Sequence, residues 1–253
     1  MTIRTVNTNG VAVIEIARPE KKNALTQAMY TAMAEAIVAA DADAAIRAVL
    51  ITGQPGIFTS GNDLEDFMTR PPQGEDSPVF QFMKALAECA KPVVAAVTGG
   101  AIGIGTTMLL HCDLVYVSDE ARLAMPFVGL GLVPEYASSL LVTQRVGHAK
   151  ATELLLLGEP FNGEAAVEMG IANAVLPAAE VVNHARRMAE RFNALPPGAV
   201  RESKALMRRA QKSLVEETIR TEAEIFGKRL RSPEAMEAFQ AFFQKRKPDF
   251  SKF

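Results

Sequence analysis

Apolar positions in the first half of the chain either alternate with polar ones or run together in short stretches. Residues 2–17 alternate around an Asn9-Gly10 turn signal and predict a β-hairpin. Three short, nearly continuous apolar runs span residues 47–52, 92–97 and 113–117. Runs of this length are typical of strands that are covered on both faces.

Helical spacing of apolar positions occurs once in the first half and dominates the second. Residues 26–40 are rich in Ala and Met at helical spacing, and Thr26 can cap this helix. Later helical patterns span residues 138–157, 163–170 and 180–194. From Pro196 to about residue 246 the chain is amphipathic, with breaks expected at Gly227 and Pro233.

The order of these elements predicts an α/β fold in two parts. Strands and helices alternate up to about residue 125, and only helices follow. We therefore expect a core domain over residues 1–195 and a helical C-terminal region over residues 196–253.

Composition indicates an ordinary globular protein. The chain has 253 residues, of which 49% are hydrophobic and 22% charged, and this length can bury a large core without disulfides. Its two cysteines, Cys89 and Cys112, favour a reducing compartment. No apolar leader and no apolar window of membrane-spanning length occur, so we expect a cytoplasmic protein that does not bind membranes.

Charge is distributed unevenly along the chain. From Arg201 onward, 13 Lys and Arg residues face 8 Asp and Glu residues, which gives +5. Because the whole chain carries −2, the first 200 residues carry −7. This balance does not favour nucleic-acid binding. The basic C-terminal region is either a solvated helical face or a surface for an anionic ligand or an acidic neighbouring subunit.

Several common catalytic and binding signatures are absent from the sequence. It contains no G-x-G-x-x-G, no P-loop, no G-x-S-x-G, no H-E-x-x-H and no C-x-x-C. The three histidines, His111, His148 and His184, are isolated, so we expect them to be structural or solvated. The sequence therefore predicts no metal and no redox cofactor.

Two glycine-rich turns are the more informative feature. Residues 58–64 follow the predicted strand at 47–52, and residues 98–105 follow the strand at 92–97. Both run into a predicted helix. Such turns can direct two backbone N–H groups at one point and form an oxyanion hole. The alternative from composition alone is that both are plain strand-to-helix turns.

The ordered motifs resemble the enoyl-CoA hydratase/isomerase (crotonase) superfamily over nearly the whole chain. The matching segments are Arg18-Pro19, Asn23-Ala24-Leu25, residues 58–64, 91–97, Gly99, 103–105, 112–114, 160–166 and 170–173. The resemblance implies a spiral of ββα turns with a helical C-terminal trimerisation region. It also implies acyl-CoA substrates, with coenzyme A as part of the substrate, and a homotrimer or dimer of trimers.

The resemblance also implies roles for individual residues. The thioester oxygen would accept hydrogen bonds from the main-chain N–H groups of Asn62 and Ile104. The residues implied to bind substrate are Ala24, Ser60, Gly61, Asn62, Asp63, Leu64 and Ile104. For the CoA phosphates the charge of Lys245 or Lys247 is favoured, although any basic tail would suit them.

The carboxylates decide which reaction we expect. A typical hydratase of this family uses two glutamates, and this sequence has Thr107 and Phe127 at those positions. Glu135 instead resembles the single glutamate of the Δ3,Δ2-enoyl-CoA isomerase branch, although Pro-Glu is also a common helix start. We predict that Glu135 moves a proton from C2 to C4, in an apolar pocket provided by Phe127, Leu130 and Leu132.

Two alternatives stay open at this point. The first is hydration or another crotonase-type reaction on an acyl-CoA. The second is a non-catalytic acyl-CoA binder, or assembly subunit, that would keep the two glycine-rich turns without needing Glu135.

Overall fold

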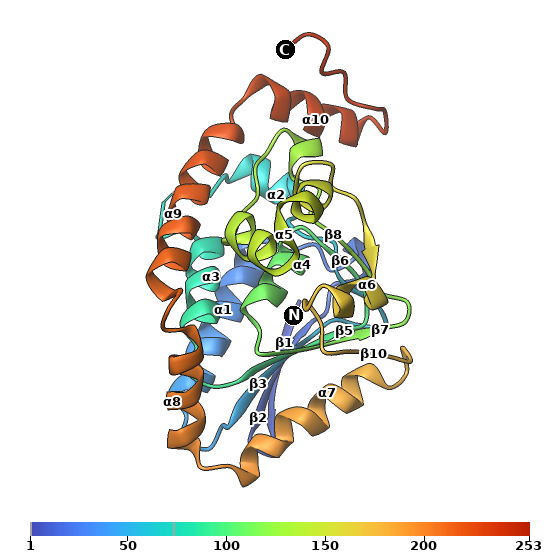
Figure 1. Ribbon diagram of the computed structural model, residues 1–253. Helices are drawn as coiled ribbons and strands as arrows, with labels where there is room; N and C mark the ends of the chain where they lie inside the picture. Colours follow the sequence, from blue (N-terminus) through green and yellow to red (C-terminus); the bar gives the residue numbers. More distant parts are fainter. Residues whose placement is uncertain (1, 73) are drawn as a thin grey trace.

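The computed structural model describes residues 2–72 and 74–253, and its core contains two β-sheets (Figure 1). The larger sheet has six strands in the order β1-β2-β3-β5-β7-β10. Their bounds are β1 (Ile3–Thr8), β2 (Val11–Ile16), β3 (Ala48–Thr52), β5 (Val93–Val97), β7 (Leu114–Ser118) and β10 (Ala174–Leu176). β1 and β2 form the predicted antiparallel hairpin, and the other neighbouring strands are parallel.

The smaller sheet has four strands in the order β4-β6-β8-β9. Their bounds are β4 (Gly56–Thr59), β6 (Gly99–Ile102), β8 (Arg122–Ala124) and β9 (Phe161–Asn162). Along the chain, β3, β5 and β7 are each followed by one strand of this smaller sheet and then by helical structure. The repeated strand–strand–helix unit is the ββα spiral that the resemblance implied.

The chain forms ten α-helices over residues 2–72 and 74–253, and some of them cover the two faces of the larger sheet. The helices are α1 (Gln27–Ala42), α2 (Leu64–Thr69), α3 (Pro78–Glu88), α4 (Ile104–Thr107), α5 (Ser138–Leu155), α6 (Gly163–Glu168), α7 (Val181–Glu190), α8 (Pro197–Arg208), α9 (Lys212–Arg229) and α10 (Pro233–Phe243). Figure 1 shows α7 on one side of this sheet and α1 and α3 on the other. The helices predicted over 26–40, 138–157, 163–170 and 180–194 are confirmed, and α5 contains a kink at Gly147.

Both faces of β3 are apolar because successive side chains point to opposite sides of the sheet and each side is covered. Leu50 packs with Val181 and Ala185 of α7, whereas Val49 and Ile51 face the main core on the other side of the sheet. All five residues of β3 are buried. The prediction of a strand covered on both faces is therefore confirmed.

The C-terminal helices pack onto the core of their own chain. On α8, Lys204 and Arg208 both form ion pairs with Asp113, at 2.6 and 3.0 Å. On α9, Ile219 and Phe226 belong to the main hydrophobic core. The domain boundary expected at residue 195 stays a prediction. The side chains that α9 buries belong to the same hydrophobic core as the residues before this boundary.

One predicted helix break is wrong and the other is confirmed. Gly227 lies inside α9, and the chain breaks instead at residues 209–211, between α8 and α9. A glycine costs a helix only about 1 kcal/mol relative to alanine, which the burial of the adjacent Phe226 can offset. Pro233 begins α10 as expected, and the Ser232 side chain caps it. Over residues 2–72 and 74–253, no helix combines the length and the apolar character that crossing a membrane requires.

Candidate active site

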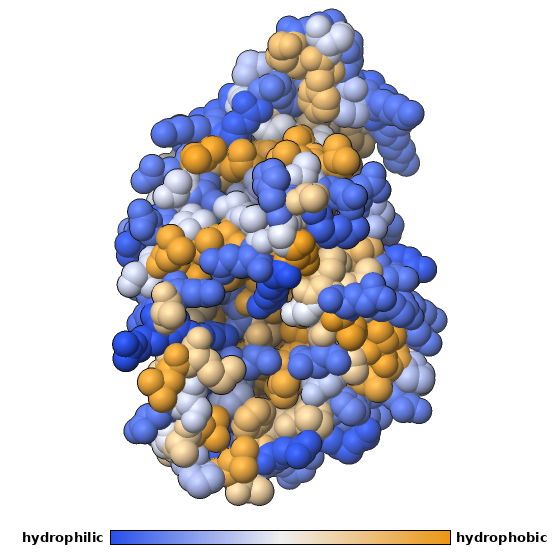
Figure 2. All heavy atoms as spheres, viewed as in Figure 1, coloured by the Kyte–Doolittle hydropathy of each residue, from blue (hydrophilic) through white to orange (hydrophobic). Residues whose placement is uncertain are grey.

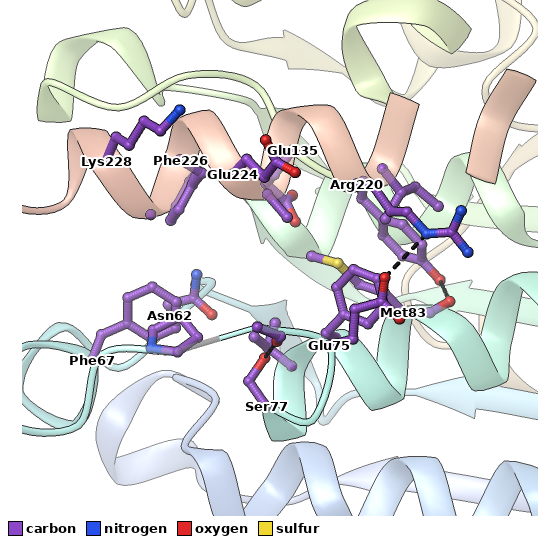
Figure 3. A pocket seen from close by; sticks show the side chains of 18 of the residues that line it. Asn62, Phe67, Glu75, Ser77, Met83, Glu135, Arg220, Glu224, Phe226 and Lys228 are labelled. Atoms are coloured by element: carbon purple, nitrogen blue, oxygen red, sulfur yellow. Dashed lines mark hydrogen bonds and ion pairs between the residues drawn. The ribbon is translucent and has the colours of Figure 1, made fainter. Parts of the chain in front are cut away.

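A cavity of about 460 Å³ lies between α9 on one side and α2, α3 and the loop before α3 on the other. Figure 3 shows Phe226 and Lys228 on α9 across the cavity from Asn62 and Phe67. Its wall is mainly apolar, and the apolar lining residues include Phe67, Val79, Phe80, Met83, Ile219 and Phe226. The charged lining residues other than Glu135 are Glu75, Arg220, Glu224, Lys228 and Arg231. A long apolar group can lie within the cavity while an anionic group meets the basic side chains.

Glu135 lies in the cavity wall, immediately before the turn that leads into α5. The residue is only 5% exposed, and the Thr107 hydroxyl donates a hydrogen bond to its carboxylate. Burial raises the pKa of Glu135 to about 8, although the Thr107 hydrogen bond acts against the increase and the nearby charge of Glu222 adds to it. Glu135 can therefore both accept and return a proton near neutral pH.

The turn after Glu135 has an unusual backbone. Tyr136 and Ala137 both have left-handed conformations, with φ of 61° and 55°. A non-glycine residue in this region costs about 1–2 kcal/mol, so the surroundings must hold the turn. The Tyr136 hydroxyl donates to the Met83 carbonyl at 2.7 Å, and the ring stacks on His111 with centroids 3.7 Å apart.

His111 supports the same turn from the opposite side. Burial lowers its pKa to about 3, so the imidazole is neutral, and its Nε2 donates to the Tyr136 carbonyl at 2.8 Å. The three histidines therefore have the expected structural or solvated character, since His184 packs edge-on against Tyr116 and His148 is exposed.

The first glycine-rich turn directs the main-chain N–H of Asn62 away from its neighbouring strand segment. Leu25 N–H donates to the Gly61 carbonyl at 2.8 Å, and Asp63 N–H donates to the Leu25 carbonyl at 2.9 Å. In this parallel bridge the N–H of the intervening Asn62 faces the other side. Within residues 2–72 and 74–253 it has no protein acceptor, and Asn62 lines the cavity.

The second turn places Ile104 at the start of α4. Gly103 precedes it with φ of 58°, a conformation suited to glycine, and the first N–H of a helix has no acceptor within the helix. Bare glycines bring the two turns together. A Cβ on Gly61 would lie 2.8 Å from the Ile102 carbonyl oxygen, and one on Gly105 would lie 2.6 Å from the Thr59 side chain.

Only Asn62 and Glu135 among the predicted site residues line the cavity. Asp63 caps α2 through the Asp66 N–H and pairs with Arg18 at 2.6 Å, so its contacts hold the loop. The other predicted binding residues of this loop, Ala24, Ser60, Gly61 and Leu64, flank Asn62 or its bridge partner in the chain. Lys245 follows α10 and is not a lining residue, whereas Lys228 and Arg231 are.

The three residues that were expected to form the apolar pocket of Glu135 are absent from the cavity lining. Phe127 and Leu132 are buried in the main core and Leu130 packs against it, but none of the three lines the cavity. The apolar lining comes instead from α2, α3 and α9, elements far from Glu135 in the sequence.

Two groups near the site had no signal in the sequence. The Tyr30 hydroxyl, on α1, donates to the Asn62 side-chain oxygen. Burial and then the charge of Glu135 raise the pKa of Tyr30, so the phenol stays neutral. Glu222, on α9, accepts hydrogen bonds from the turn that follows Glu135. Over residues 2–72 and 74–253, no group of three His, Cys, Asp or Glu side chains could hold a metal ion.

A cavity with a buried carboxylate, beside two packed glycine turns on a ββα spiral, defines a crotonase-type fold and site. The chain belongs to the enoyl-CoA hydratase/isomerase family, whose model matches residues 6–252. The predicted crotonase-like fold is confirmed.

Individual relatives carry both activity names of the family. A Bacillus subtilis protein named "Probable enoyl-CoA hydratase" is 31% identical over 246 residues, covering 95% of each chain. Human enoyl-CoA delta isomerase 2 is 32% identical over 252 residues, covering 97% of this chain and 64% of the human protein. The solved structure of Pseudomonas aeruginosa OdaA is 55% identical, with a TM-score of 0.94 over 95% of this chain and 98% of OdaA.

Proposed function

We propose that this protein is a Δ3,Δ2-enoyl-CoA isomerase. The observation that carries the proposal is the buried Glu135 carboxylate in the wall of the cavity, with a pKa raised by burial to about 8. Glu75 and Glu224, the other carboxylates that line the cavity, are exposed. Glu135 is therefore the one lining carboxylate, over residues 2–72 and 74–253, that is shielded from solvent.

In the proposed reaction, Glu135 removes a proton from C2 of a 3-enoyl-CoA. The electron pair of that C–H bond forms a C1–C2 double bond as the C1–O π pair moves onto the thioester oxygen, which gives a dienolate that still contains the C3–C4 double bond. The N–H groups of Asn62 and Ile104 stabilise this oxygen. Glu135 then gives the proton to C4, whose new C–H bond takes the C3–C4 π pair. The C1–O double bond re-forms and the C1–C2 pair becomes the C2–C3 double bond, so the double bond has moved from position 3 to position 2.

The two residues at the hydratase positions support isomerisation over hydration. The Thr107 hydroxyl donates a hydrogen bond to the Glu135 carboxylate. Thr107 therefore positions Glu135, and it cannot act as the second carboxylate that a typical hydratase has at this position. Phe127 is 5% exposed within the core and has no polar atom to hold water. Hydration in this family requires two carboxylates that hold a water between them, and neither of these positions carries a carboxylate.

Substrate binding follows the division of the cavity lining. The apolar wall suits the acyl chain, and Lys228 and Arg231 suit the CoA phosphates, with Lys245 a further candidate. Coenzyme A belongs to the substrate, and the proposed chemistry uses no separate cofactor. Both cysteines are free thiols, which supports the cytoplasmic location that we propose.

A homotrimer, or a dimer of trimers, is also part of the proposal. The face viewed in Figure 2 is a mosaic in which hydrophobic residues stand among hydrophilic ones. The C-terminal helices expose several large apolar side chains, including Leu206, Met207, Leu214, Phe242 and Phe243. Sedimentation should give three or six times the chain mass of 27.2 kDa, and a monomeric mass would contradict the assembly.

Product analysis tests the reaction. The purified protein is incubated separately with 3-enoyl-CoA and with 2-enoyl-CoA, and the products are separated by chromatography. We expect conversion of the 3-enoyl to the 2-enoyl thioester, with slow or absent hydration of the latter. Efficient formation of 3-hydroxyacyl-CoA would contradict the isomerase and favour a hydratase. Tight binding without turnover of either substrate would favour a non-catalytic acyl-CoA binder.

A further inference from the structure

Glu222 is a buried carboxylate that the proposed reaction does not use. It lies on α9, is only 6% exposed, and is absent from the described cavity lining. Burial raises its pKa, and hydrogen bonds from Ser139 and Ala137 counteract that increase. Burying a carboxylate costs free energy, so its presence here needs a structural or functional reason.

Among the described residues, the hydrogen-bond partners of Glu222 are Ala137, in the turn that follows Glu135, and Ser139, in the first turn of α5. Its Oε2 accepts from the Ala137 N–H at 2.5 Å, and its Oε1 accepts from the Ser139 N–H at 3.0 Å. The Ser139 hydroxyl also donates to Oε1. Because every partner is a donor, the contacts favour the ionised form of Glu222.

This carboxylate replaces a local helix cap. α5 begins after Ala137, which has a left-handed conformation and no side chain that can accept from the first turn. The first N–H groups of a helix need acceptors and favour a negative charge. Glu222 supplies both from a helix 85 positions further along the chain. Without it, the left-handed turn would lose the anchor on its α5 side.

On the proposed catalytic role of Glu135, we infer that Glu222 is a positioning residue: it fixes the Tyr136–Ala137 turn and so holds the Glu135 carboxylate against the cavity. His111 holds the Tyr136 carbonyl, and Glu222 holds the Ala137 and Ser139 N–H groups. The turn is therefore anchored on both sides. Its two left-handed residues persist because these distant groups hold them, and local sequence does not require them.

Glu222 also influences the charge of Glu135. Its negative charge lies close enough to raise the pKa of Glu135. The other titratable groups near Glu135 are Tyr30 on α1 and the adjacent Tyr136, both neutral phenols. The charged groups that line the same cavity are Glu75, Arg220, Glu224, Lys228 and Arg231. Arg220 is paired with Glu75 at 3.1 Å.

The test replaces Glu222 by glutamine in the full-length protein. Glu222→Gln keeps the shape, removes the charge and turns one acceptor into a donor facing N–H groups. We expect kcat on 3-enoyl-CoA to fall about 10- to 100-fold with KM within about twofold, because the base is displaced while binding is kept. The rising limb of the pH–rate profile should move to lower pH, because a negative charge no longer raises the pKa of Glu135.

The matched control is Glu217→Gln. Glu217 is an exposed residue of the same helix and is not part of the cavity lining. The Glu217→Gln variant should have the kcat and the pH profile of the wild type. A wild-type kcat and an unmoved pH limb in a folded Glu222→Gln protein would overturn the inference, and so would an equal loss in the Glu217 control.

A second variant covers the case in which Glu222→Gln does not fold. Ser139→Ala removes only the hydroxyl donor and keeps both N–H contacts. We expect a loss of a few-fold in kcat at unchanged KM, with a melting temperature near that of the wild type. A kcat equal to that of the wild type would then count against positioning by Glu222.

One measurement separates this inference from the proposed function. The carboxyl group of Glu135 is followed by carbon-13 NMR titration in wild type and variant, with Glu135→Gln used to assign the signal. If the wild type does not isomerise 3-enoyl-CoA, the proposed function fails. The inference still stands if Glu222→Gln lowers the Glu135 titration midpoint, and it fails if that midpoint stays in place.

Discussion

The two glycine-rich turns and the turn that carries Glu135 contrast in how their shapes are determined. Gly61 and Gly103 adopt positive φ values of 89° and 58° at little cost, because they lack a Cβ. Tyr136 and Ala137 adopt similar φ values at a cost, and distant partners hold them. The proposed oxyanion donors are thus built by local sequence, whereas the proposed base is placed by tertiary contacts.

This difference separates the parts of the site that tolerate side-chain changes from those that do not. Backbone donors depend on the path of the chain, so the side chains of Asn62 and Ile104 can vary. Glu135 depends on its own carboxylate and on groups from α4, α9 and the segment around His111. We therefore expect substitutions around Glu135 to act through charge and position, and substitutions in the glycine turns to act through backbone geometry.

The largest effect should come from Glu135→Gln. Removing the only shielded carboxylate that lines the cavity, among the residues described, should lower isomerase turnover by about 10²–10⁴-fold. Acyl-CoA affinity should stay within a few-fold, since the apolar wall and the basic side chains are unchanged. Steady-state kinetics on 3-enoyl-CoA and calorimetric binding measure the two quantities. Turnover near that of the wild type would show that another group is the base.

A change at Gly61 should be the next largest. A Cβ there would meet the Ile102 carbonyl oxygen at 2.8 Å, and the φ of 89° disfavours any other residue. Gly61→Ala should displace the Asn62 N–H and lower kcat by about 10²–10³-fold, the effect of losing one oxyanion donor.

The matched control for Gly61→Ala is Gly198→Ala in α8. A Cβ at Gly198 meets no atom within 4 Å, and its φ is not positive. Its kcat should equal that of the wild type. If both alanine variants isomerise as fast as the wild type, the backbone of the first turn does not position an oxyanion donor.

Much of this contrast could be predicted from the sequence, and the reason lies in the range of the interactions. Glycine-rich turns after apolar runs are local signals, so the two turns could be located from nearby residues, whereas the choice of Asn62 and Ile104 within them was implied by the family resemblance. Glu135 was identified by motif. Its hydrogen bond from Thr107 and the effect of the Glu222 charge on its pKa depend on residues of other helices, and no local sequence pattern indicates such contacts. Gly227 was misread for a related reason, since tertiary packing sustains α9 through a residue that locally disfavours helix.

A subtler prediction concerns the hydrogen bond from Thr107. Glu135 must be ionised to accept the C2 proton, so activity should rise with pH through a midpoint of about 8. The Thr107 hydroxyl stabilises the ionised form and lowers the pKa of Glu135. Thr107→Val should therefore move the rising limb to higher pH, opposite to the shift expected for Glu222→Gln. The pH–rate profile of kcat/KM measures this, and equal shifts of the same sign in both variants would refute the charge argument.

The same raised pKa predicts how stability depends on pH. Glu135 binds its proton more tightly in the folded protein, at about 8, than in the unfolded chain, where 4.5 is its ordinary value. Between these values the folded state holds more protons, so the contribution of Glu135 to stability is present below about pH 4.5 and is lost as pH rises through about 8. Glu135→Gln should therefore raise the melting temperature more at pH 8.5 than at pH 5. A gain that does not change with pH would show that the carboxyl titrates at an ordinary pKa.

The smallest effect on activity should come from Asn62→Ala. The main-chain N–H remains in the same turn, so kcat should fall less than about fivefold, far less than for Gly61→Ala. The variant should instead lose stability, because the Tyr30 hydroxyl is fully buried and would lose its Asn62 acceptor, at a cost of about 1–3 kcal/mol. Thermal melting measures this loss.

Combining Asn62→Ala with Tyr30→Phe removes the orphaned hydroxyl and should recover part of the melting temperature, while kcat stays as in the single Asn62 variant. This cycle separates the side chain of Asn62, which satisfies a buried phenol, from its backbone, which we propose to contact the substrate. If Asn62→Ala lowers kcat as strongly as Gly61→Ala, the side-chain amide takes part in the reaction. Asn62 would then act on the substrate through its side chain as well as its backbone, and the proposed division between backbone oxyanion donors and a side-chain base would not hold for this residue.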